Sequence, residues 1–144
     1  MKKSLFIIIS IAFFGLNSSN PVLAQCDTDS HCESCIKQIE DGFTYLKSYK
    51  IDGEGGAKSK VEYSYVFTKG AQYFLNICSG TDNADGIILT IYDSTRKMVG
   101  TNYLNGKFFP VVKYPCSATG IYYITFTFEK PTTFCGGSVL GFKR

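Results

Sequence analysis

The chain has 144 residues and a formal net charge of +3, so it is short enough for a single domain and too weakly basic to indicate a nucleic-acid or anionic-membrane partner. A chain of this size can bury a real core, and its aromatic content of 15%, with ten tyrosines and twelve phenylalanines of which three lie in the first 24 residues, fits this. Only one histidine is present, which leaves a single candidate for any catalytic arrangement that depends on histidine.

The start of the chain has the layout of a secretory signal peptide. Lys2 and Lys3 form a basic beginning, the apolar stretch Leu5–Leu16 follows, and Ala24 supplies a small residue before the expected cleavage point. The apolar stretch is shorter than the about 20 residues that a membrane-spanning helix needs. We therefore predict cleavage after Ala24 and an exported protein, which is periplasmic, at the cell surface or extracellular. The mature chain, 25–144, is not expected to insert into a membrane.

Residues 30–48 are predicted to form one helix. Ser30 and Glu33 fit a capping box at its start. Apolar side chains then recur with a period near 3.6 residues. They are Cys32, Cys35, Ile36, Ile39, Phe43 and Leu46. Because the other positions are mostly polar, the helix is one-sided and must dock on another element. A glycine-rich connector, 52–56, follows it.

The segment His31–Cys35 places the histidine next to two cysteines spaced C-x-x-C, which are residue types of thiol redox sites and zinc sites. A thioredoxin-like site needs a strand before the helix, and only Gln25–Asp29 precedes it in the mature chain. A zinc site would add Cys26 to this set, but His31 and Cys32 are adjacent and diverge by about 100° on a helix. We therefore interpret the cysteines as structural and His31 as a solvent-exposed residue of the first turn.

From Lys60 onward the apolar period changes to two, which is typical of β-strands. The inward-facing positions form four sets, namely Val61, Tyr63, Tyr65, Phe67; Tyr73, Leu75, Ile77; Ile87, Leu89, Ile91; and Tyr122, Ile124, Phe126, Phe128. Weaker strands are expected at 98–103 and 107–113, and "SVLGF" closes the series after a turn at "PTTFCGG". About seven strands with frequent turn signals predict an antiparallel, jelly-roll-like β-sandwich over 57–144, after a helix and connector at 25–56.

The order of motifs in this β-domain resembles the bacterial pre-peptidase C-terminal domain and related secreted jelly-roll modules. The matching features are "G-x-x-Y" entering a strand, an Asp-rich loop, a strand ending in "Y-D" and a late "G-x-Y-x-I". They fall at Gly70 and Tyr73, Asp82 and Asp85, Tyr92 and Asp93, and Gly120, Tyr122 and Ile124. The resemblance covers 60–142 and implies a non-catalytic β-sandwich for export, stability or binding. The helix and the cysteines depart from that family's pattern.

All six cysteines lie after the predicted leader, and an exported chain with an even number of cysteines is expected to pair them as disulfides. Six cysteines allow 15 pairings, among which the sequence does not choose. Our hypothesis joins two strand ends, ties the helix to the final strand and closes one local loop. Its pairs are Cys78–Cys116, Cys35–Cys135 and Cys26–Cys32. These cross-links would hold the one-sided helix on the sheet.

Acidic residues offer two further kinds of chemistry. The loop "GTDNADG" resembles a calcium-binding loop, but Thr81 stands where the first carboxylate belongs, so only a simple site on Asp82, Asn83 and Asp85 remains as a candidate. A turn of this composition also needs no metal. A carboxylate pair for hydrolysis has as its sources Asp52, Glu54, Glu62, Asp82, Asp85, Asp93 and Glu129. None of them has a recognisable catalytic setting, so we predict no catalytic residue and no cofactor.

The candidate binding surfaces are aromatic. Tyr92 and Tyr123 are expected on the strand face opposite the core, grouped with the loop 82–85, although aromatic residues on strands more often serve plain sheet packing. Phe108 and Phe109 are neighbours and cannot both face inward on a regular strand. The sequence therefore predicts a non-catalytic binding or assembly module with a protein partner. A glycan-binding module and a carboxylate-dependent hydrolase are the alternatives.

Overall fold

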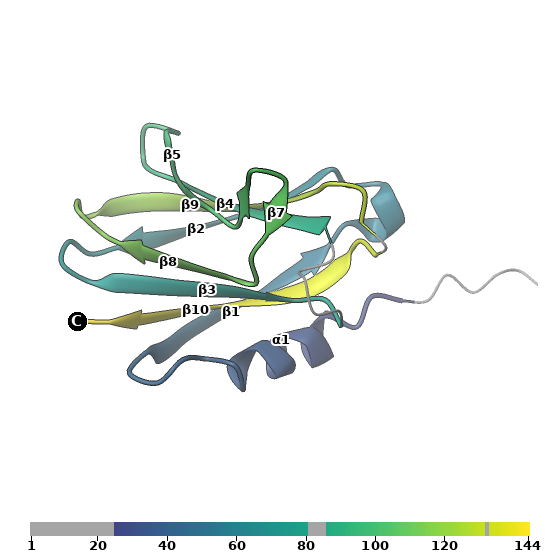
Figure 1. Ribbon diagram of the computed structural model, residues 1–144, viewed down its shortest axis with the longest axis horizontal. Coiled ribbons are helices and arrows are strands. Elements are labelled where there is room, and N and C mark those ends of the chain that lie inside the picture. The colour runs from purple at the N-terminus through teal and green to yellow at the C-terminus, as the bar shows by residue number, and fades with distance from the viewer. Residues whose placement is uncertain (1–24, 81–85, 132) are drawn as a thin grey trace, which may run out of the picture.

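The computed structural model describes residues 25–80, 86–131 and 133–144, so the predicted leader and most of the Asp-rich loop lie outside the described residues. Within these residues, two four-stranded antiparallel sheets pack face to face, and helix α1 lies along the outer side of one of them (Figure 1). The predicted fold class, an antiparallel β-sandwich with an N-terminal helix and disulfides, is confirmed.

Sheet A has the strand order β1-β10-β3-β8. The bounds of these strands are β1 Thr44–Asp52, β10 Cys135–Lys143, β3 Gln72–Cys78 and β8 Val111–Pro115. Sheet B has the order β2-β9-β4-β5. Its strands are β2 Lys60–Phe67, β9 Gly120–Phe128, β4 Ile87–Tyr92 and β5 Met98–Thr101. All neighbours in these sheets are antiparallel, and this alternation of early with late strands is the jelly-roll order.

Two small elements connect the strands. A short 3-10 turn, Glu54–Gly56, links β1 to β2, and a hairpin of β6 Tyr103–Leu104 and β7 Lys107–Phe108 links β5 to β8. The hairpin turns at Asn105 and Gly106, whose φ angles are 50° and 76°. An Asn-Gly pair suits this turn because both central residues need a positive φ. The hairpin interrupts the two weaker strands that the sequence predicts in this region.

The core lies between the two sheets and contains the four inward-facing sets that the sequence predicts. One residue from each set is fully buried, namely Phe67, Leu75, Leu89 and Phe126. The same core also takes in Tyr49 and Ile51, both fully buried, from β1. The two-residue period therefore identified the core of the later strands correctly and missed the contribution of the first one.

The predicted helix over 30–48 is wrong in its second half. Helix α1 spans Thr28–Ile36, and strand β1 follows after a turn. Asp27 caps the helix by accepting the N–H of Ser30 at 3.1 Å, in place of the predicted Ser30–Glu33 box. The segment that became β1 is rich in aromatic and β-branched residues, which favour strands. Its apolar residues fit either period over so short a range, and pairing with β10 decides for the strand.

A glycine separates α1 from β1. Gly42, which the helix prediction placed mid-helix, has a φ of +87°, a left-handed conformation that glycine adopts without strain. The turn brings Phe43 onto Phe74, with ring centroids 5.3 Å apart, and so covers this end of the outer face of sheet A. Because β1 pairs with β10 from Thr44 onward, the sandwich begins there and not at the predicted boundary of residue 57.

Helix α1 lies directly on β10 because a glycine faces it. An ideal Cβ atom on Gly137 would lie 2.6 Å from the backbone N of Cys32, so a larger residue does not fit while the helix keeps this position. Gly137 belongs to β10 and not to the turn that the sequence predicts. Beside this contact, the buried Asn76 amide donates to the Cys35 carbonyl at 2.9 Å and accepts the Val139 N–H at 3.1 Å. Asn76 thus joins the helix to the sheet.

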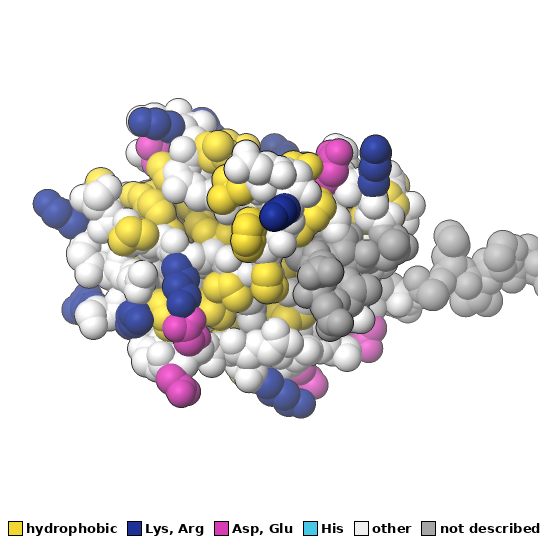
Figure 2. All heavy atoms as spheres, viewed as in Figure 1, with side chains coloured by type: hydrophobic (Ala, Val, Ile, Leu, Met, Phe, Trp, Pro, Cys, Tyr) yellow, Lys and Arg dark blue, Asp and Glu magenta, His cyan; other side chains and the backbone are white. Residues whose placement is uncertain are grey.

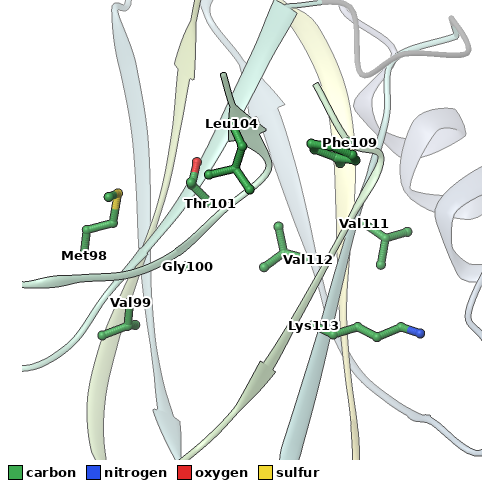
Figure 3. Close-up of a pocket in the computed structure, with 9 residues that line it drawn as sticks. All are labelled: Met98, Val99, Gly100, Thr101, Leu104, Phe109, Val111, Val112 and Lys113. Atoms are coloured by element: carbon green, nitrogen blue, oxygen red, sulfur yellow. The ribbon is translucent and has the colours of Figure 1, made fainter. Parts of the chain in front are cut away.

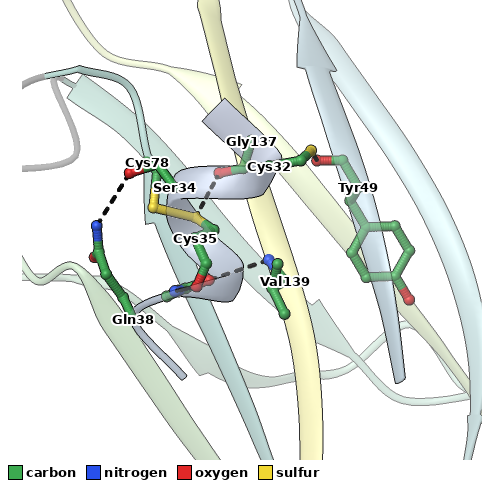
Figure 4. Close-up of a disulfide and its surroundings, with 9 residues drawn as sticks. Cys32, Ser34, Cys35, Gln38, Tyr49, Cys78, Gly137 and Val139 are labelled. Carbon is green, nitrogen blue, oxygen red and sulfur yellow. Dashed lines mark hydrogen bonds between the residues drawn. A yellow bond between two sulfur atoms is a disulfide. The ribbon is translucent and has the colours of Figure 1, made fainter. Parts of the chain in front are cut away.

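Two disulfides fasten α1, and neither is a predicted pair. Cys35 bonds to Cys78 on β3 (Figure 4) and Cys26 bonds to Cys135 on β10, with Cα–Cα distances of 5.7 and 5.4 Å. The expectation that a helix cysteine is cross-linked to the sheet is confirmed by Cys35. The predicted pairs Cys78–Cys116, Cys35–Cys135 and Cys26–Cys32 are wrong.

The antiparallel pairing of β3 with β8 excludes the first of those pairs. Cys116 follows β8, and its N–H donates to the carbonyl of Ala71, just before β3 begins. Cys78 lies at the other end of β3, about 20 Å away at about 3.3 Å per residue. Cys78 instead lies under α1, within reach of Cys35. The apolar pattern indicates how long each strand is, but it does not indicate which strand end faces the helix.

Cys32 and Cys116 are free and buried, which corrects the expectation that every cysteine is oxidised. The Cys32 thiol donates to the Tyr49 carbonyl at 3.4 Å, and burial raises the pKa of this thiol. The Cys116 thiol donates to the Ala118 carbonyl at 3.1 Å. A thiol with a raised pKa stays uncharged and reacts slowly. The C-x-x-C segment therefore combines half of a structural disulfide with a buried thiol and is not a redox pair.

Candidate functional site

The two tyrosines predicted to bind a ligand are neighbours on the outer face of sheet B. Tyr92 of β4 lies directly opposite Tyr123 of β9 in the strand register. The Arg96 guanidinium lies over the Tyr123 ring, 3.5 Å from its centroid, and the Arg96 side chain donates to the Glu62 carboxylate at 2.9 Å. One face of the Tyr123 ring is therefore already occupied by a side chain of the same protein.

Arg96 also sets the electrostatics of this face. Its hydrogen bond, aided by a weaker one from Lys60, lowers the pKa of Glu62 despite partial burial. The two cations and this carboxylate line a small hollow of about 140 Å³ together with Tyr92. The two cations thus share one carboxylate, and the face carries no further acidic side chain among the described residues of the hollow.

The second predicted pair of aromatics lies on and beside the β6–β7 hairpin. Phe108 is half-buried and packs on Tyr103, with ring centroids 4.6 Å apart. Phe109 keeps 44% of its surface exposed. The prediction that these two neighbours do not both face the core is confirmed. Phe109, and not Phe108, lines the larger hollow next to the hairpin.

This hollow is a groove of about 490 Å³ between β5, the last strand of sheet B, and β8, the last strand of sheet A. Figure 3 displays its lining, which we call the β5–β8 groove. The lining residues are Met98, Val99, Gly100, Thr101, Leu104, Phe109, Val111, Val112 and Lys113. Leu104 and Phe109 lie at its hairpin end, and Val112 points from β8 into the gap (Figure 3).

The groove is apolar and open to solvent. Met98 is 57% exposed, Leu104 is 55% exposed, and Phe109 lies close by. Figure 2 shows hydrophobic side chains gathered on this side of the molecule, with charged side chains of both signs around them. The remaining large exposed hydrophobic residues among those described lie elsewhere, for example Val66 and Ile121 on the outer face of sheet B. The β5–β8 groove thus joins more exposed apolar side chains than any of these other patches.

A buried asparagine holds the hairpin end of the groove in place. The Asn102 side chain accepts the Leu89 N–H at 2.7 Å and donates to the carbonyls of Ile87 at 3.0 Å and Phe109 at 3.1 Å. Because Asn102 is only 1% exposed, these bonds are shielded from water. They fix the position of the Phe109 backbone, directly after the hairpin. Sequence reasoning singled out the phenylalanines of this segment and missed the asparagine, although the Asn-Gly turn nearby was a signal for a hairpin.

The chemistry predicted at the start of α1 is not assembled. Cys26 and Cys35 are bonded to other cysteines, so they are not available to zinc. His31 is half-buried rather than exposed as predicted, and its ring lies beside Gly80. The calcium and binding candidates Asp82, Asn83 and Asp85 lie outside the described residues. Among the residues that are described, no cluster of His, Cys, Asp or Glu is suited to a metal ion.

Four of the carboxylates that the sequence offers for hydrolysis have local structural partners, namely Asp52, Glu54, Glu62 and Asp93. Asp93 accepts hydrogen bonds from the Thr95 side chain and backbone and from the Lys97 N–H, which lower the pKa of Asp93. Asp52 accepts the Glu54 N–H at 2.8 Å at the end of β1. The Asp52 and Asp93 carboxylates thus fasten turns.

No helix in the described part of the chain has both the length and the apolar character to cross a bilayer.

Comparisons with known proteins add little to this geometry. No protein-family model matches the chain, and no curated protein sequence matches it. A solved structure that is similar to it is a periplasmic lysozyme inhibitor of g-type lysozyme, PliG from Aeromonas hydrophila. The identity is 15%, the TM-score is 0.42, and the match covers 71% of this chain and 85% of that one. The resemblance to pre-peptidase C-terminal domains stays a prediction.

Proposed function

We propose that this protein is an exported, non-catalytic binding module that contacts a partner protein through the β5–β8 groove. The observation that carries the proposal is the gathering of Met98, Leu104 and Phe109, all highly exposed, around one groove at the open edge of the sandwich. Contiguous exposed apolar surface is unfavourable in water and is typical of interaction sites. Export is supported by the two disulfides, which form and persist in oxidising compartments.

A protein partner suits this site better than a glycan. Sugar rings are bound by stacking on a free aromatic face, and Arg96 covers one face of Tyr123. The groove is lined mainly by aliphatic side chains, with Phe109 as the aromatic residue among those described there. Aliphatic and aromatic side chains of another protein fill such a groove and exclude water from it.

A binding role also suits the acidic residues better than hydrolysis does. A general acid of a hydrolase needs a carboxyl group whose pKa is raised toward neutrality. For Glu62 and Asp93 the hydrogen bonds lower the pKa, which is the opposite direction. Both therefore stay charged at neutral pH and act as partners for neighbouring groups.

Site-specific photo-crosslinking of the native exported protein tests this function. A photoreactive amino acid replaces Leu104 in the groove or Val66 on sheet B, which have matched exposures of 55% and 57%. We expect a discrete protein adduct at position 104 and none at position 66. The charged variant Leu104→Asp should lose the partner, whereas Val66→Asp should keep it. Equal adducts at both positions, or equal retention by both charged variants, would refute the proposal.

A further inference from the structure

We propose that the partner supplies an extended segment that pairs with β8 as an additional strand of sheet A and places apolar side chains in the β5–β8 groove. This inference rests on the proposed function and specifies the kind of partner. The segment carries apolar residues at alternate positions and at least one carboxylate. Strand addition of this kind obtains its affinity from main-chain hydrogen bonds and its specificity from the pockets that receive alternate side chains.

The backbone of β8 is open for such pairing. β8 is the last strand of sheet A and pairs on one side only, with β3. The Ile77 N–H donates to the Pro110 carbonyl at 2.9 Å, which fixes which residues of β8 bond to β3. In an antiparallel pair the bonding direction alternates along the strand. Val112 therefore turns its N–H and C=O toward β3, while Val111 and Lys113 turn theirs toward the free edge.

The side chains around this edge fix the pattern of the segment. Val112 is 7% exposed and belongs to the core, so residues on its side of an added strand point between the sheets. There they meet Leu104 and Phe109, which line the same groove. Successive side chains of a strand alternate between faces. Every second residue of the segment is thus apolar, and the residues between them lie on the outer side, next to Lys113.

The charge of the groove favours an acidic segment. Lys113 is among the lining residues, and none of the described lining residues is acidic. Two further exposed lysines belong to the segments that carry groove residues, namely Lys97 before Met98 and Lys107 on the β6–β7 hairpin. The Glu40 carboxylate pairs with Lys113, but that lysine side chain is still 42% exposed. A carboxylate on the segment would complement this basic margin.

A second copy of the chain fits the edge less well than an acidic partner does. A twofold antiparallel pairing of β8 with itself would bring the two Lys113 side chains onto one face, directly opposite or one diagonal apart. Like charges at such positions destabilise a strand pair.

Selection of binders from a displayed library of random linear peptides, with the full chain as bait, tests the inference. We expect enriched peptides with apolar residues at alternate positions, an Asp or Glu, and few prolines. A synthetic peptide of that sequence should protect the Val111 and Lys113 amides from hydrogen exchange, as observed by NMR. Leu104→Asp should weaken its binding about tenfold or more, and Val66→Asp should leave it unchanged.

The variant Val111→Pro tests the backbone contact itself. It removes an N–H that points away from β3, so the fold should be kept, as checked by thermal unfolding, while peptide binding should fall about tenfold or more. Wild-type affinity in this variant, enriched peptides with helical apolar spacing, or protection at Val66 instead of β8 would overturn strand addition. If Leu104→Asp loses the native partner but no extended peptide binds β8, strand addition fails and the proposed function stands. If that variant keeps the native partner, both fail.

Discussion

The outer face of sheet A is covered by another element, whereas its β8 edge is not. Its outer face is covered by α1, which is held by the Cys35–Cys78 and Cys26–Cys135 disulfides and by the contact of Gly137 with the helix backbone. Its edge at β8 is uncovered and forms one wall of an apolar groove. Helix α1 thus buries the outer face, whereas Met98, Leu104 and Phe109 around the groove stay exposed.

A buried asparagine stands at each of these surfaces. Asn76 accepts one backbone N–H and donates to one carbonyl, and it draws the helix onto the sheet. Asn102 makes the same kinds of bonds, and they tie the two ends of the β6–β7 hairpin to β4, next to the groove residues Leu104 and Phe109. The same side-chain chemistry therefore anchors an element at each surface, the helix at one and the hairpin at the other.

The largest expected effect comes from breaking a cross-link on the covered face. Replacing both Cys35 and Cys78 by serine should lower the free energy of unfolding by about 3–4 kcal/mol, since the disulfide closes a long loop of the unfolded chain. Urea denaturation measures the change. Cys116→Ala, which removes a buried thiol but no cross-link, is the control and should cost only about 1 kcal/mol. An equal loss in both would contradict the account of the covered face.

Gly137→Ala should have the next largest effect. The added Cβ would lie 2.6 Å from the Cys32 backbone N, so the helix must move and stability should fall by about 1–3 kcal/mol. Gly120→Ala is a matched control on β9, because an added Cβ there meets nothing within 4 Å. A melting temperature as low for the control as for Gly137→Ala would show that the glycine serves the strand and not the helix contact.

The two asparagines separate stability from binding. Asn102→Ala and Asn76→Ala should each lower the free energy of unfolding by about 1–3 kcal/mol, because each leaves buried backbone groups without a partner. Only Asn102→Ala should also weaken the partner contact, since it releases the hairpin end of the groove. Unfolding curves and crosslinking yield at position 104 together test this. Equal yields for the two variants would remove Asn102 from its role in the groove.

The smallest expected effect lies on the outer face of sheet B. The hydrogen bond from Arg96 lowers the folded-state pKa of Glu62, so the pair stabilises the fold fully above the unfolded-state pKa of about 4.3. That contribution is lost as the pH falls through the lower folded-state pKa. Because the pair is partly solvated, its contribution to the free energy of unfolding should be less than about 1 kcal/mol. The stability difference between wild type and Arg96→Ala should shrink in acid, and a constant difference would argue against the pair.

Local rules predicted the later strands and the core between them. The two-residue period from Lys60 onward places Phe67, Leu89 and Phe126 inside, as the structure has them. The same rules failed at β1, because its apolar residues fit two periods and only pairing with β10 selects the strand. The prediction of the disulfide pairs failed for a related reason, since the pairing depends on which strand ends lie under α1.

The groove was predictable only in part. Phe109 was singled out because two neighbouring aromatics cannot share one side of a strand, and this local argument holds. Met98 and Leu104 have no such local signal. They gather with Phe109 because the last strands of two different sheets lie side by side. That proximity follows from the jelly-roll order, which no short stretch of sequence contains.

The position of β10 has a consequence for how the molecule is made. β10 lies between β1 and β3 in sheet A, although it comes from the far end of the sequence. The disulfide of Cys26 also cannot form before Cys135 is present, which is 109 residues further along the chain. When the chain is synthesised or transported from its N-terminus, α1 and β1 therefore lack their partner strand until β10 has emerged. The order of the strands thus delays folding until synthesis or transport of the domain is nearly finished.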